Sequence, residues 1–260
     1  RDLHLSIRRQ RQMCIRDSPF KDKKYEYWTK TTKEGNYAKK LRKKIGSDKV
    51  ECYFDGDLEA KGKKFFSTGD LAVSNNDEFL AFSVDDKGGE YFTIFVRRIV
   101  DNKIIEKIED TAGGIVWSYD DKSFFYRKHD SQKRPRQILQ HKLGSPSTED
   151  VLIFEEKDER FTCSIDTTSC EKYYTIETSE HTTSETYYFH KDEKKFEPKL
   201  VLKREDGINL PIGNIPTGSG NSLLYDVGKF DIKDTINIIL KNKIRKIDIL
   251  ELSTLNKKIY

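Results

Sequence analysis

Short apolar segments separated by polar turns recur along the chain at a nearly constant interval. The pattern is clearest over residues 70–86 (DLAVSNNDEFLAFSVDD), where an apolar segment, a polar turn and a second apolar segment follow one another. It returns over residues 115–126 (IVWSYDDKSFFY) and, in a looser form, over residues 161–176. Equivalent positions 44 and 46 residues apart are marked by Ser74, Ser118 and Ser164. A repeat of about 40–50 residues, each made of a few short strands, is typical of the blades of a β-propeller.

The repeat predicts three complete blades of four strands each, over residues 70–110, 114–156 and 160–204. The expected strands are 71–73, 79–84, 91–97 and 103–108 in the first blade, 115–117, 123–128, 136–142 and 150–154 in the second, and 161–165, 172–178, 185–190 and 199–203 in the third. Trp117 stands where Val73 stands in the blade before it, and we expect both side chains to belong to the core.

Two further regions flank the repeat. Before it, strands are expected over residues 25–32, 37–42 and 50–54, followed by a short helical turn within residues 58–68. After Gly207 the pattern breaks, and residues 208–260 are expected to form one or more divergent partial blades. That region has a loop rich in Gly and Pro over 209–221 and strand-like segments over 223–227, 230–232, 235–240 and 244–250. The sequence therefore predicts an all-β chain, a partial β-propeller of about four four-stranded blades.

The charge of the chain changes this picture little. The formal net charge is +4, but residues 1–18 hold five Arg and two Asp and so contribute +3 of it. The string RRQRQMCIRDS within them resembles the translation of a sequencing adapter, so we expect these residues to be an artefact or, failing that, a disordered basic leader. The basic run Lys39–Lys44 has no interleaved aromatic residues, which favours a solvated strand edge over a phosphate-binding patch. We therefore expect no nucleic-acid partner.

The composition suits several thin sheets rather than one thick core. Apolar residues make up 35% of the chain and charged residues another 35%, and the chain has no apolar run long enough to span a membrane. The four cysteines contain no CxxC pair, which favours reduced thiols over a disulfide framework or a zinc site. Reduced thiols in turn predict a cytoplasmic protein, and the lack of a long apolar run predicts no membrane partner.

No motif assigns catalytic chemistry to this chain. The nucleophile elbow GxSxG, the zinc motif HExxH, the P-loop and GxGxxG are all missing, and GSGNS at residues 218–222 has the right residue types in the wrong order. None of the five histidines lies in a recognisable triad context. The acid pairs that could suggest a glycosidase fall at expected hairpin turns and strand ends, and they are Asp85/Asp86, Asp120/Asp121 and Glu155/Glu156. The sequence therefore assigns no catalytic, cofactor-binding or metal-binding residue, and we expect no cofactor.

Several stretches in the same order carry a family resemblance. They are YEYWTKTTKEGNY, KGKKFFSTGDLAVSNNDEFLAFSVDDKGGEYFTIFVR, GGIVWSYDDKSFFYRKHD, RPRQILQHKLG, EDVLIFEEKDERF and HTTSETYYF. From about Pro19 to Gly207 the chain resembles the amino-terminal region of the oligopeptidase B group, within the prolyl oligopeptidase family of serine peptidases. The resemblance implies a seven-bladed propeller that caps a carboxy-terminal α/β-hydrolase domain and restricts access to short peptides. It also implies cleavage after Lys or Arg, by Ser, Asp and His residues of that second domain.

The resemblance leaves two interpretations open. Residues 209–221 do not match the family well and no hydrolase domain follows, so the first interpretation is a truncated gene model of an oligopeptidase. Its partners would be the hydrolase domain of the same protein and short basic peptides, and the fragment alone would not catalyse hydrolysis. The second interpretation is a stand-alone propeller that serves as a protein-interaction module. A partial ring leaves blade faces and strand edges uncovered, so we expect poor solubility or dimerisation of the isolated chain.

Overall fold

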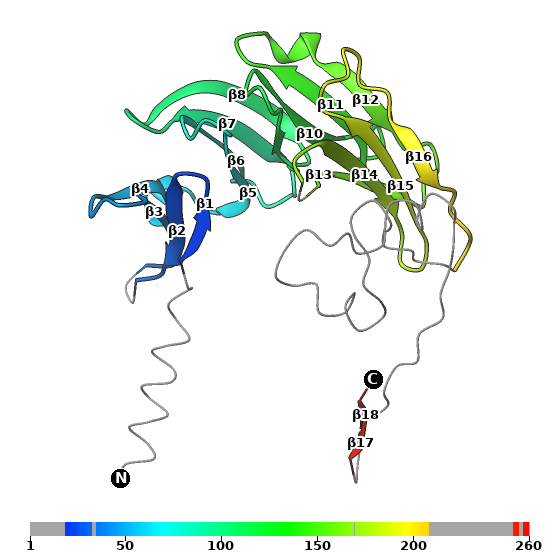
Figure 1. Ribbon diagram of the computed structural model, residues 1–260, viewed down its shortest axis with the longest axis horizontal. Helices are drawn as coiled ribbons and strands as arrows, with labels where there is room; N and C mark the ends of the chain where they lie inside the picture. Colours follow the sequence, from blue (N-terminus) through cyan, green and yellow to red (C-terminus); the bar gives the residue numbers. More distant parts are fainter. Residues whose placement is uncertain (1–18, 33–34, 169, 208–251, 255–256, 260) are drawn as a thin grey trace. The chain divides into compact units, whose positions relative to one another are not determined.

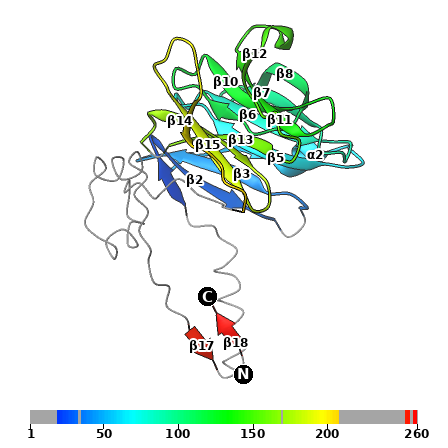
Figure 2. The ribbon, with the colours of Figure 1, turned by 90° about the vertical axis from the view of Figure 1, so that its right-hand side faces the viewer.

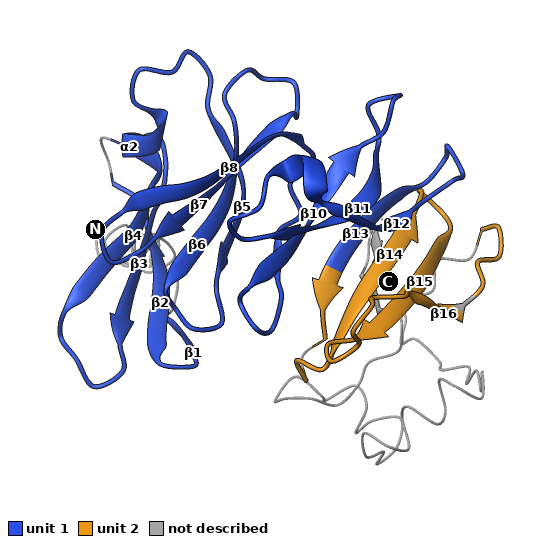
Figure 3. Cartoon of the chain, turned by 90° about the horizontal axis from the view of Figure 1, so that it is seen from above, with its two compact units in different colours: residues 1–165 blue, residues 166–260 orange. Residues whose placement is uncertain are grey.

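The computed structural model of the chain describes residues 19–32, 35–168, 170–207, 252–254 and 257–259. The expectations for the leader, for the loop over 209–221 and for the strands between 223 and 250 lie outside these residues. The chain divides into two compact units, residues 1–165 and 166–260, which are blue and orange in Figure 3.

The first sheet lies at the start of the first unit and is antiparallel, in the order β1–β2–β3–β4. Its strands are β1 (Phe20–Asp22), β2 (Tyr25–Lys30), β3 (Lys39–Lys44) and β4 (Val50–Asp55). The sequence predicted three of these strands but missed β1, whose three residues are all exposed and so show no apolar pattern. The short helix α2 (Gly56–Ala60) follows, because the Asp55 carboxylate accepts a hydrogen bond from the Leu58 N–H and caps its first turn.

The second sheet of the first unit joins two blades. The strands of its first blade are β5 (Ser67–Val73), β6 (Phe79–Asp85), β7 (Phe92–Arg98) and β8 (Lys103–Thr111). Those of its second blade are β9 (Val116–Trp117), β10 (Ser123–His129), β11 (Pro135–Lys142) and β12 (Val151–Glu155), with a 3-10 helix over Ser147–Glu149. The two blades form one sheet through the pair Thr111 and Lys128, because the chain leaves β8 and runs along β10 before it enters β9. Strands β5–β8 and β10–β12 are coloured cyan to green in Figures 1 and 2.

The last four-stranded sheet has the order β13–β14–β15–β16. Its strands are β13 (Thr162–Thr167), which crosses the boundary between the units, and β14 (Tyr173–Ser179), β15 (Ser184–His190) and β16 (Lys199–Leu202) in the second unit. The second unit also holds the pair β17 (Leu252–Thr254) and β18 (Lys257–Ile259). Every strand predicted between residues 71 and 203 overlaps an observed strand, and the predicted fold class, an all-β partial propeller, is confirmed.

Strand β6 explains how the blades of the first unit pack. Alternate side chains of a strand point to opposite faces, and β6 is buried on both. One face, with Leu80 and Phe82, belongs to a cluster between the first sheet and the β5–β8 blade, which we call the first joint. The other face, with Ala81, belongs to a cluster between the β5–β8 and β9–β12 blades, which we call the second joint. The buried members of the first joint are Tyr27, Tyr53, Phe54, Phe66, Leu80, Phe82, Val84 and Ile99, and those of the second are Ala81, Ile94, Val96, Ile108, Ile115, Trp117, Phe124, Tyr126 and Leu139.

The two expected core positions on first strands differ in burial. Trp117 is buried in the second joint, as predicted. Val73 is half-buried and packs against the first joint. Both side chains pack in a joint between blades, as core residues do.

Candidate functional site

The turn between the first and second strands of a blade is built in the same way three times. In each turn a side-chain hydroxyl accepts a hydrogen bond from the backbone N–H five residues later, and the backbone N–H of the hydroxyl residue donates to the carbonyl of that later residue. The hydroxyls belong to Ser74, Ser118 and Thr168, with O–N distances of 2.9, 3.0 and 3.2 Å. The prediction that Ser164 marks the third position is therefore wrong, because Ser164 is an exposed residue inside β13. The pattern persists although the third residue is a threonine, since either hydroxyl can close the turn.

In the first unit these turns are tied to one another across the blades. The carboxylate of Asp121 accepts hydrogen bonds from the Asn75 N–H at 2.7 Å, the Asn75 side-chain amide at 2.9 Å and the Asn76 N–H at 2.8 Å. The same Asn75 amide donates to the Ser118 carbonyl at 2.9 Å, and Lys23 of the first sheet donates to the Asn75 side-chain oxygen at 2.7 Å. The first sheet and the two blades of the second sheet are thus linked along one row of turns.

The hairpins between second and third strands also share a device. The Asp85 carboxylate accepts four backbone N–H bonds from residues 87–90, at 2.8–3.0 Å. Burial pushes the pKa of Asp85 upward, but these four donors together hold it below its ordinary value. In the second unit the Glu180 carboxylate holds its own turn, and hydrogen bonds from Thr182 and Thr183 lower the pKa of Glu180 to about 2. A carboxylate therefore closes each hairpin from within.

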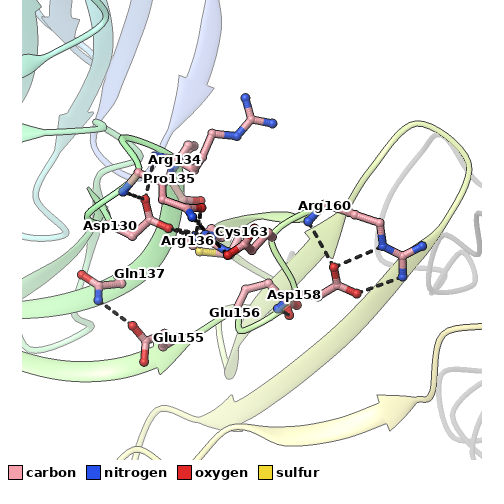
Figure 4. A network of polar contacts seen from close by, with 12 residues as sticks. Asp130, Arg134, Pro135, Arg136, Gln137, Glu155, Glu156, Asp158, Arg160 and Cys163 are labelled. Carbon is pink, nitrogen blue, oxygen red and sulfur yellow. Dashed lines mark hydrogen bonds and ion pairs between the residues drawn. The ribbon is translucent and has the colours of Figure 1, made fainter.

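The corresponding hairpin of the β9–β12 blade is the most elaborate of these (Figure 4). The Asp130 carboxylate accepts the N–H groups of Gln132 and Arg134 at 2.8 and 2.9 Å and forms a short ion pair with the buried Arg136. Arg136 also donates to the Gln132 side-chain oxygen at 2.9 Å. Burial raises the pKa of Asp130, but the bonds from Arg134 and Arg136 outweigh it and lower the pKa overall. In Figure 4 the Arg134 side chain points away from this network.

The acid pairs weighed as glycosidase candidates lie at turns and strand ends, as predicted. Besides Asp85 and Asp121, Asp120 accepts a bond from the Ser118 hydroxyl at 2.7 Å. Glu155 accepts one from the Gln137 side chain at 2.7 Å, and the buried Glu156 accepts the Asp158 N–H at 2.8 Å. These contacts account for five of the six acids as parts of the fold, and Asp86 is an exposed residue of the turn after β6.

One histidine, His141, contacts a carboxylate with each of its ring nitrogens. It is buried in the blade, with Nδ1 2.7 Å from Asp150 and Nε2 3.4 Å from Glu106 of β8. The other Asp150 oxygen accepts the Tyr126 hydroxyl at 2.7 Å, and burial followed by this bond raises the pKa of Tyr126. Because both ring nitrogens of His141 face carboxylates, the group links the two blades of the second joint rather than activating a serine hydroxyl.

The sulfur chemistry within the described residues is limited. Cys52, Cys163 and Cys170 are free thiols, and Cys14 lies outside the described part. Burial raises the pKa of Cys163 to about 12, so this thiol is a poor nucleophile. Among the described residues there is also no group of three or more His, Cys, Asp or Glu side chains placed to hold a metal ion. No helix in the described part of the chain is long and apolar enough to cross a membrane.

The basic run Lys39–Lys44 on β3 is largely neutralised. Ion pairs join Lys39 to Asp55 at 2.5 Å, Arg42 to Glu51 at 3.1 Å and Lys43 to Glu26 at 3.2 Å. The partner acids come from the neighbouring strands β2 and β4, so three of the five cations of this run are paired within the first sheet. The expectation of a strand edge is wrong, because β3 lies between β2 and β4 and pairs with both. The ion pairs agree with the expectation that the run is not a phosphate-binding patch.

A second basic segment was missed in the sequence. Residues 127–136 (RKHDSQKRPR), which we call the basic hairpin, hold five Lys or Arg and one Asp, so they carry a formal +4, equal to the net charge of the whole chain. The structure pairs Arg136 with Asp130. The other four cations form no ion pair with any residue that the structure describes, and they are Arg127, Lys128, Lys133 and Arg134. The net charge counted in windows of about ten residues along the sequence would have shown this segment, which the net charge of the whole chain does not show.

The comparisons with known proteins fit this architecture. A family model described as the prolyl oligopeptidase N-terminal beta-propeller domain matches residues 10–212. The chain is 26% identical over 199 residues to Protease 2 of Moraxella lacunata, which covers 73% of this chain and 29% of that protein. It resembles the structure of oligopeptidase B from Leishmania major with a TM-score of 0.70 and 27% identity, covering 74% of this chain and 28% of that one.

A second solved structure gives the same result. Oligopeptidase B from Trypanosoma brucei, in a closed form with covalently bound antipain, has a TM-score of 0.68 and 27% identity, again over 74% of this chain and 28% of that one. The chain thus spans less than a third of the length of these relatives. Because the family model covers most of the chain and the observed sheets are its blades, this protein belongs to the prolyl oligopeptidase family, as a chain carrying its N-terminal β-propeller domain.

Proposed function

We propose that this chain is the substrate-gating propeller part of a serine oligopeptidase that hydrolyses short peptides after Lys or Arg. The observation that carries the proposal is the likeness to oligopeptidase B from Leishmania major, at 27% identity over 74% of this chain. Under this proposal the partners are the α/β-hydrolase domain of the same protein and short basic peptides. The protein would act in the cytoplasm, in keeping with its free thiols.

The joints between the blades support a gating role. A propeller excludes folded proteins only if neighbouring blades stay together, and in the first unit they are held by buried clusters on both faces of β6. Hydrogen bonds tie the turns as well, as between Asp121 and Asn75. Catalysis itself would come from the hydrolase domain, so we assign no catalytic residue here.

The test starts from the gene that encodes this chain. Its reading frame is followed past the codon for Tyr260, and the complete encoded protein is assayed with fluorogenic peptides that end in Arg, Lys or Pro before the cleaved bond. We expect a GxSxGG motif in the continuation and cleavage of the peptides after Arg and Lys. A folded protein that contains Arg and Lys should not be cleaved. A variant with the motif serine replaced by Ala is the matched inactive control.

Two outcomes would contradict the proposal. Cleavage after Pro alone would overturn the basic specificity. A stop codon directly after Tyr260 would favour the interaction-module interpretation instead. The isolated chain of 260 residues is expected to give a blank with an arginyl substrate, and turnover by it that a serine-directed inhibitor abolishes would overturn the assignment of catalysis to a second domain.

A further inference from the structure

The basic hairpin carries polar groups that the fold leaves unused. Three buried polar atoms near it form no hydrogen bond with any described residue: Nε of Arg127, Nδ1 of His129 and the hydroxyl of Tyr91. A buried polar atom without a partner is costly, so native structures rarely keep several together without a reason. Here all three belong to half-buried side chains, part of whose surface is open to solvent.

These side chains are neighbours. Arg127 and His129 are two residues apart on β10, so they lie on the same face of the strand. The rings of Tyr91 and His129 are 4.8 Å apart, and the Lys133 ammonium lies 5.6 Å from the centre of the Tyr91 ring. The group therefore joins one guanidinium, one ammonium, one imidazole and one phenol at the end of the second joint.

The backbone makes room for the guanidinium. Gly114 has a φ of +74°, and a Cβ there would lie only 2.4 Å from Arg127 Nε. The adjacent carbonyl of Gly113 accepts the Arg127 N–H at 2.7 Å, which fixes the strand beside the glycine. Any larger residue at position 114 would push the Arg127 side chain out of its position.

The group is made of cations and hydrogen-bond donors that no described acid contacts. Burial, and next the Arg127 charge, lower the pKa of His129, while Asp130, Glu90 and Asp110 act in the opposite direction. Of these acids Asp130 is already paired with Arg136. Glu90 and Asp110 are exposed and form no ion pair with described residues, so neither neutralises Arg127 or Lys133 by direct contact. Neutral His129 and Tyr91 can each donate one hydrogen bond.

We propose that Arg127, His129, Tyr91 and Lys133 form a carboxylate-binding site that takes the C-terminal carboxylate of a short peptide. A guanidinium matches a carboxylate through two parallel hydrogen bonds, and the Arg127 guanidinium can supply two nitrogens for them. Lys133 adds an ammonium at the rim, and the His129 and Tyr91 donors complete the shell. That the ligand is a peptide, rather than another carboxylic acid, rests on the proposed function.

The site is tested by titration calorimetry on the full 260-residue chain with two matched probes, acetyl-trialanine with a free carboxylate and the same peptide as its amide. We expect the acid to bind at least about tenfold more tightly than the amide, because the amide cannot accept two charged hydrogen bonds. Arg127→Gln should reduce affinity for the acid about tenfold, and Lys133→Gln, an exposed change that cannot unfold a core, should reduce it by a smaller factor. Lys40→Gln on β3 is the matched control and should change nothing.

Equal binding of acid and amide, or unchanged binding by both the Arg127 and Lys133 variants, would overturn the site. Competition by inorganic phosphate as strong as that by the peptide acid would overturn its assignment to peptides. The binding measurement needs no catalysis. If the complete protein proves not to be a peptidase while the acid still binds through Arg127, the proposed function fails and the carboxylate site stands.

Discussion

The two joints of the first unit solve the same packing problem with different side chains. The first joint is aromatic, and its rings meet edge to face, as between Phe54 and Phe82 at 5.4 Å and between Tyr27 and Tyr53 at 5.7 Å. The second joint is mainly aliphatic, with the three rings of Trp117, Phe124 and Tyr126 among its nine buried residues. The two joints use opposite faces of β6, so they share one strand but no buried side chain.

The polar contacts of the two joints are of the same two kinds. At the first joint Arg97 is paired to Glu59 at 2.6 Å, and the Arg42 guanidinium donates to the main-chain carbonyl of Asp77 at 3.0 Å. At the second joint His141 Nε2 lies 3.4 Å from the Glu106 carboxylate, and Trp117 donates to the Ala72 carbonyl at 2.8 Å. The two joints therefore differ in the composition of their cores more than in the kind of polar contact.

The largest expected effect comes from Trp117→Ala. It removes a buried ring and the bond to Ala72, so we expect the free energy of unfolding to fall by about 3–5 kcal/mol. Urea denaturation measures the loss, and hydrogen exchange locates it: amides of β9 and β10 should lose protection while those of β2 and β3 keep theirs. Trp117→Phe keeps most of the volume and should cost far less. Equal loss of protection in both joints would show that they do not act separately.

Glu59→Gln addresses the first joint and should cost less. It leaves Arg97 without its carboxylate, and Arg97 Nε is already buried without a partner. The two side chains are only 11% and 19% exposed, so we expect a loss of about 2–3 kcal/mol, below the value for a fully buried pair. Glu109→Gln is the matched control, because its pair with Lys107 is exposed and should contribute less than about 1 kcal/mol. Similar losses for both variants would mean that the first joint is not held by its ion pair.

Much of this fold follows from local patterns in the sequence. Apolar segments bounded by polar turns located every strand between residues 71 and 203, because each blade strand has to bury a face. β1 escaped because three exposed residues carry no such pattern, and Thr168 was missed as the third turn residue because a hydroxyl, not a serine, is what the turn requires.

The contacts between blades could not be predicted in this way. Asn75 and Asp121 lie 46 residues apart, and nothing local shows that their turns meet. The pairing of charges could not be predicted from the sequence either. The run Lys39–Lys44 stands out in the sequence, but three of its cations form ion pairs with acids on adjacent strands, whereas four of the five cations of the basic hairpin form none with described residues. A run of basic residues forms a basic surface only where the fold places no acidic side chains within ion-pair distance of it.

The smallest expected effect separates contacts between blades from those within one turn. Asp121→Ala removes three hydrogen bonds to Asn75 and Asn76, and we expect it to cost about 1–2 kcal/mol because the site is partly exposed. Asp120→Ala, one residue earlier, removes bonds only within its own turn, namely those that Asp120 accepts from the Ser118 hydroxyl and the Lys122 N–H. Both variants should lower stability, but only Asp121→Ala should speed hydrogen exchange at the Asn75 and Asn76 amides, 45 residues or more away. If Asp120→Ala exposes those amides equally, the turns are coupled through the backbone and not through the Asp121 carboxylate.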